Sequence, residues 1–79
     1  MAESKYPVSP EIMADLEKRF TYHAPKEDQP ERYVDLRERA HDLALAIVRS
    51  TPKSREQSVA LTHIETAIMW ANASIARNE

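Results

Sequence analysis

Hydrophobic side chains recur at alternating intervals of three and four residues in two long stretches of the chain. In one stretch they are Tyr33, Leu36, Ala40, Leu43 and Ile47, and in the other they are Leu61, Ile64, Ile68, Ala71 and Ile75. This spacing places each set on one side of an α-helix. We therefore predict helices over residues 31–50 and 54–77, and the short connection between them favours antiparallel packing.

Local signals mark where the helices begin. Ser9 followed by Pro10 has the pattern of an N-cap and a first helical residue, which predicts a short helix over residues 9–19. Ser54 and Gln57 have the spacing of a capping box, with Ser54 bonding an amide of the first turn and Gln57 reaching back. These signals complete an all-α prediction of one short helix and two long antiparallel ones.

The segments outside the predicted helices are irregular. Residues 20–30 have no helical period, and Pro25 and Pro30 each favour extended backbone in the residue before them, so we expect an extended strap. Residues 1–8 are expected to form a flexible leader. Residues 1–79 together are expected to form a single helical domain.

Composition removes several classes of function. The chain has no glycine, which excludes phosphate-binding loops and dinucleotide-binding turns, and no cysteine, which excludes thiolate metal sites and cysteine nucleophiles. A net charge of −2 disfavours a general grip on duplex nucleic acid or anionic membranes. No apolar run is long enough to span a bilayer. No catalytic signature or paired metal-ligand pattern occurs, so we expect no enzyme, no metal and no cofactor.

The last predicted helix is apolar around most of its circumference. Between Val59 and Ala76 only Glu65 carries a formal charge. A lone helical hairpin would leave Met69, Trp70 or Ile75 facing water, whereas such helices are normally covered. We therefore expect further copies of the chain to provide the cover in a homo-oligomer.

Aromatic, imidazole and cationic groups gather in the strap. Tyr22 or His23 can offer a flat face to a nucleobase while Lys26 meets a phosphate, as in proteins that bind single-stranded nucleic acid. Alternatively, Phe20 and Tyr22 pack over the open end of the hairpin. Residue types alone leave both interpretations open.

Three arginines on the long helices require separate interpretation. Arg37 borders a second apolar line on its helix, where it can bind an anion or form a salt bridge with another subunit. Arg39 follows Asp35 by four residues, which favours an intrahelical ion pair on a solvated face. Arg77 lies near a helix C-terminus, where the helix dipole favours a cation.

Three segments carry a resemblance to a known family. RFTYHAPK (Arg19–Lys26), QPERY (Gln29–Tyr33) and ALTHIETAIMWANASIARNE (Ala60–Glu79) resemble the small phage anti-CBASS sponge proteins, which sequester the cyclic oligonucleotide messengers of bacterial defence. The resemblance covers about residues 19–79. It implies an intertwined helical hexamer that binds cyclic dinucleotides at subunit interfaces and cyclic trinucleotides in separate pockets, without catalysis.

The resemblance also implies roles for individual residues. Tyr22 corresponds to the family tyrosine that stacks on a base of a cyclic dinucleotide, and Arg37 to its basic partner. Arg77, and with it Arg39, correspond to the trinucleotide pocket. The expected function is a sponge acting in the cytoplasm of an infected bacterial host, and the alternative is a helical oligomer that serves as an adaptor for a protein partner.

Overall fold

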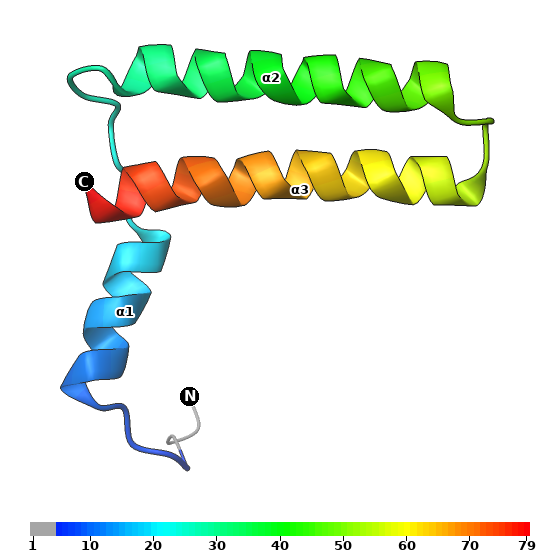
Figure 1. The fold of residues 1–79 in the computed structure, drawn as a ribbon. Coiled ribbons are helices and arrows are strands. Elements are labelled where there is room, and N and C mark those ends of the chain that lie inside the picture. Colours follow the sequence, from blue (N-terminus) through cyan, green and yellow to red (C-terminus); the bar gives the residue numbers. More distant parts are fainter. Residues whose placement is uncertain (1–4) are drawn as a thin grey trace.

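The computed structural model describes residues 5–79, which contain three α-helices and no β-strand. α1 spans Pro10–Phe20, α2 spans Gln29–Ser50 and α3 spans Arg55–Asn78. α2 and α3 lie side by side in opposite directions, and α1 projects away near the C-terminal end of α3 (Figure 1). The predicted all-α class and the packing of the two long helices are confirmed. Of the expected leader, residues 1–4 lie outside the described residues, and residues 5–9 precede α1 without helical structure.

Serine side chains cap two of the helices at their N-termini. Ser9 Oγ accepts a hydrogen bond from the Ile12 N–H at 3.2 Å, and Ser54 Oγ accepts one from the Gln57 N–H at 3.1 Å. The Gln57 side chain reaches further back than the capping-box pattern predicts. It donates to the Thr51 backbone oxygen at 3.1 Å and to Thr51 Oγ1 at 2.9 Å, so it holds the connector between α2 and α3.

The strap ends earlier than the two prolines suggested. α2 begins at Gln29, two residues before the expected start, because Pro30 fits the first helical turn, where its missing N–H needs no partner. Residues 21–28 therefore connect α1 to α2, and we use the name strap for them. Within the strap, Glu27 has φ of 54°, in the left-handed region.

Burial is shallow throughout residues 5–79. None of the described hydrophobic side chains is fully buried, and the only buried residue in this range is Gln29, at 3% exposure. Ile68 and Ile75 are half-buried between the long helices, whereas Met69 and Trp70 are 64% and 66% exposed. One chain therefore leaves a large apolar surface on α3 uncovered.

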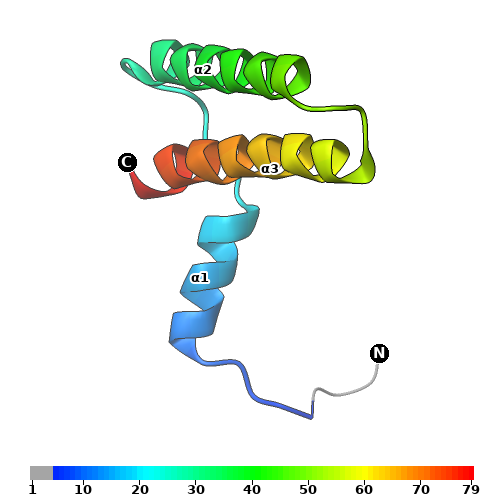
Figure 2. The ribbon, with the colours of Figure 1, turned by 45° about the vertical axis from the view of Figure 1, so that its right-hand side comes forward.

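The short first helix adds little to this burial. α1 leaves the helical pair instead of packing along it, and a second direction of view shows the same arrangement (Figure 2). Its apolar residues Ile12 and Leu16 are 50% and 42% exposed. α1 therefore presents an uncovered apolar face of its own.

Candidate anion-binding groove

The strap passes the end of the helical pair and forms one wall of a groove of about 400 Å³. Tyr22 and His23 line it from the strap, Arg37 from α2 and Arg77 from α3. The structure thus brings four of the six candidate residues together, although they are spread over more than half of the sequence. Their meeting point depends on the antiparallel pairing, which puts the first half of α2 beside the last turns of α3.

Two aromatic rings near the groove are exposed to solvent. Tyr22 is 82% exposed and Phe20 is 81% exposed, so packing over the open end of the hairpin does not occur within one chain. His23 is half-buried, and its Nε2 donates to the Lys18 backbone oxygen at 3.1 Å. This bond ties the beginning of the strap to the last turn of α1, and Tyr22 lies beside it with its ring available for stacking.

Positive charge dominates the groove. Arg19, Arg37 and Arg77 line it, and none of its lining residues is an aspartate or a glutamate. Arg19 forms an ion pair with Asp15, Nε to Oδ2 at 3.0 Å, whereas neither Arg37 nor Arg77 forms an ion pair within the part of the chain that the structure describes. Two guanidinium groups are therefore available for an anion such as a phosphate.

The other two candidate residues lie outside this groove. The Lys26 side chain is exposed. Arg39 pairs with Asp35, Nε to Oδ2 at 3.0 Å, and its side chain is 76% exposed. Side chains two positions apart on an α-helix differ by about 200° around the helix axis. Arg39 therefore faces away from the side that Arg37 occupies. It borders a different hollow of about 260 Å³ that is otherwise apolar.

The lining residues that sequence reasoning did not single out include Arg19, Tyr33 and Asn72. Asn72 Oδ1 is buried and accepts no hydrogen bond within the described part of the chain. It is one of only six polar residues between Val59 and Ala76, which was the available signal. The presence of Arg19 depends on how α1 meets the hairpin, which no local pattern indicates.

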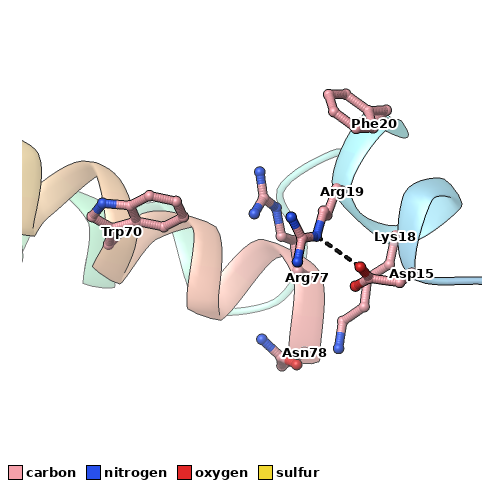
Figure 3. A pocket seen from close by; sticks show the side chains of 7 residues that line it. All are labelled: Asp15, Lys18, Arg19, Phe20, Trp70, Arg77 and Asn78. Carbon is pink, nitrogen blue, oxygen red and sulfur yellow. Dashed lines mark ion pairs between the residues drawn. The ribbon is translucent and has the colours of Figure 1, made fainter. Parts of the chain in front are cut away.

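A second hollow shares Arg19 and Arg77 with the groove, and Asp15 also lines it. It has a volume of about 440 Å³ and its lining includes Arg19, Arg77, Lys18, Phe20 and Trp70. Figure 3 shows Arg19 and Arg77 where the end of α1 comes near the last turn of α3. The Arg19–Asp15 ion pair is drawn, and Trp70 lies on an earlier turn of α3. Arg19 and Arg77 thus contribute to both hollows.

The far end of the strap is tied to α3 by a network of polar side chains. Arg32 Nη1 donates to Glu79 Oε2 at 2.8 Å, and Arg32 Nη2 bonds to Glu79 Oε1. These bonds, with a smaller contribution from Gln29, lower the pKa of Glu79 to about 2 and raise the pKa of Arg32. The pair stays ionised over the physiological range.

Other ligand classes find less support in residues 5–79. No group of three or more histidine, aspartate or glutamate side chains lies close enough there to hold a metal ion. No described helix is both long enough and apolar enough to cross a membrane. The arrangement of exposed ring, imidazole and unpaired guanidinium groups is suited to a ligand that carries bases and phosphates.

Comparison with known proteins gives one family. Residues 13–76 match the family model described as "Acb2/Tad1, hairpin domain". The matched range includes the strap, Arg37 and most of α3, and ends one residue before Arg77. No curated protein and no solved structure matches the chain.

Proposed function

The chain belongs to the Acb2/Tad1 hairpin family, the phage anti-CBASS and anti-Thoeris sponges for cyclic nucleotides, and we propose that it sequesters cyclic dinucleotides and cyclic trinucleotides. Family membership implies cyclic nucleotide sponging, and the family is generally non-catalytic. The proposed chemistry is tight binding alone, which lowers the free concentration of the messenger in the cytoplasm of the infected host.

The observation that carries the proposal is the groove beside the strap. It combines the exposed Tyr22 ring with Arg37 and Arg77, and no carboxylate lines it. A tyrosine face stacks on any nucleobase, and guanidinium groups make charge-assisted, two-pronged hydrogen bonds to phosphate oxygens. A cyclic dinucleotide presents both partners in one small ligand.

One chain supplies binding partners for only half of such a ligand. A cyclic dinucleotide has two bases and two phosphates related by a near twofold axis, whereas each chain has one Tyr22 and one Arg37 in its groove. A second copy placed by a twofold axis would supply the second ring and the second cation. With stacking worth about 1–3 kcal/mol per base, two such halves support sub-micromolar affinity.

Assembly is the second part of the proposal, and a homohexamer with intertwined chains is the expected form. Its support is the uncovered apolar surface on all three helices, which includes Met69 and Trp70 on α3, Leu43 on α2, and Ile12 on α1. Soluble monomers rarely expose large apolar patches, so we expect other copies of the chain to cover these side chains. Light scattering at micromolar concentration should give a multiple of 9.1 kDa, and the monomer mass alone would remove the shared site.

The binding function is tested by calorimetry with a panel of cyclic dinucleotides and cyclic trinucleotides. Saturable, sub-micromolar binding of at least one compound is expected, followed by recovery of the intact compound after heat denaturation of the protein. Recovery of a cleaved product would refute sequestration without catalysis. Absence of binding across the panel would refute the sponge function and favour the adaptor alternative.

A further inference from the structure

Gln29 occupies an unusual position for a glutamine. It is the most buried residue of the described chain, at 3% exposure, and both ends of its amide are used. Its Oε1 accepts a hydrogen bond from the Lys26 backbone N–H at 3.1 Å, and its Nε2 donates to Glu79 Oε1 at 3.3 Å. One side chain therefore joins the end of the strap to the end of α3, across 50 residues of sequence.

Arg32 reinforces the same junction. It lies one turn after Gln29 on α2 and holds both oxygens of the Glu79 carboxylate, while its Nη2 lies 3.1 Å from Asp28 Oδ1. Such two-pronged, charge-assisted bonds fix geometry more firmly than a single neutral bond. We use the name clamp for Gln29, Arg32 and Glu79.

The clamp adjoins a turn with an unusual backbone conformation at Glu27. Glu27 has φ of 54°, a left-handed conformation that non-glycine residues adopt only where their surroundings impose it. The Gln29 N–H donates to the Lys26 backbone oxygen at 3.0 Å, and the Gln29 side chain bonds back to the Lys26 N–H. Both hydrogen bonds that close this turn thus come from the residue that Glu79 holds.

We propose that the clamp is a positioning device for the binding groove: it holds the strap so that Tyr22 and His23 stand opposite Arg37 and Arg77. The inference rests on the proposed function of that groove. None of the three clamp residues lines the groove, so they act through the strap. The strap is then held at both ends, by the bond from His23 to Lys18 at its beginning and by the clamp at its end.

Positioning has a distinctive kinetic consequence. If the strap leaves its binding-competent position when the clamp is broken, the apparent dissociation constant rises in inverse proportion to the competent fraction. The bound complex keeps the same contacts between the ligand and the groove. Loss of the clamp should therefore slow association and leave the dissociation rate constant nearly unchanged, whereas loss of a contact residue accelerates dissociation.

The test uses two variants of the full chain with matched controls. Gln29→Met keeps the size of the side chain without its hydrogen bonds, and Gln57→Met makes the same change at the opposite end of the hairpin, where Gln57 holds the other connector. Glu79→Gln removes the clamp charge, and Glu56→Gln removes a charge from the first turn of α3. Circular dichroism and light scattering are used first to check that each of the four variants has the helical content and the mass in solution of the parent chain.

Two measurements decide the outcome. Without ligand, hydrogen exchange of the Lys26 amide should accelerate at least about tenfold in the clamp variants and not in the controls. In stopped-flow titration with cyclic di-GMP, or with whichever cyclic dinucleotide the parent chain binds, association should slow by about three- to tenfold with unchanged dissociation. Unaltered exchange, or a change confined to the dissociation rate, would overturn the clamp proposal. A parent chain that binds no cyclic nucleotide would instead overturn the proposed function, and the exchange measurement would still judge whether the clamp holds the strap.

Discussion

Removing the Tyr22 ring is the most direct test of the groove as the binding site. The side chain is 82% exposed, so Tyr22→Ala deletes almost no packing within one chain and should leave the helical content unchanged. The ring is expected to stack on one base, and base stacking on an aromatic side chain is worth about 1–3 kcal/mol. Since about 1.4 kcal/mol corresponds to a tenfold change, the affinity for a cyclic dinucleotide should fall by about five- to 150-fold per ring.

Calorimetry on the parent chain and three variants isolates this effect. Tyr22→Phe keeps the flat face and should retain most of the affinity. Tyr6→Ala removes a tyrosine of comparable exposure, 75%, from the segment before α1 and should bind as the parent does. If Tyr22→Ala keeps its assembly and binds with undiminished affinity, the ring makes no stacking contact and the groove is not the binding site.

Four further outcomes are expected. Arg37→Gln should weaken cyclic dinucleotide binding at least about tenfold in calorimetry and reduce its salt dependence, because a phosphate loses its guanidinium partner. Arg77→Ala should weaken cyclic trinucleotide binding more than cyclic dinucleotide binding, because Arg77 also lines the second hollow while Arg37 still offers a guanidinium in the groove; equal losses for both ligand classes would indicate one shared site. Ser54→Ala should lower the free energy of unfolding by about 1 kcal/mol in urea titration, because the Gln57 N–H loses its cap. Pairing lowers the pKa of Glu79 from its ordinary 4.5 to about 2, so it stabilises the fold above pH 4.5, and this stabilisation is lost as the pH falls toward 2. In melting curves recorded from pH 4.5 to pH 2, the melting temperature of Glu79→Gln should therefore fall less than that of the parent chain. Arg32, Asp28 and Lys26 are unchanged in this variant.

The sequence predicts the helices well because their signals are local. The periodic Leu61, Ile64 and Ile68 predict one face of α3, and Ser54 marks its start in the structure as in the pattern. The start of α2 was placed two residues late because Pro30 was assigned to the extended strap, although proline is equally suited to a first helical turn.

The groove is less accessible to sequence reasoning because its walls come from different elements. The sequence already distinguishes Arg37, which borders an apolar line, from Arg39, which follows Asp35 by four residues. The structure confirms the Arg39–Asp35 ion pair. Residues two positions apart on a helix differ by about 200° in direction, so Arg39 faces away from the side that Arg37 occupies. The partnership of Arg32 with Glu79 follows from the nearly equal lengths of α2 and α3, 22 and 24 residues, which bring the start of one beside the end of the other. The position of Arg19 has no such sequence basis, since it depends on the direction in which α1 leaves the hairpin.

Because burial in this chain is shallow, its thermal stability should depend strongly on whether ligand is bound. None of the described hydrophobic side chains is fully buried, so little of the free energy of folding comes from a core within one chain. Molecules that cover its surface therefore contribute a large share of that free energy. A ligand present at a hundredfold excess over its dissociation constant adds about 2.7 kcal/mol. For a small domain this corresponds to a rise in melting temperature on the order of 10 °C. The melting temperature of the protein in a lysate would therefore report how much messenger it has bound, without a label on either molecule.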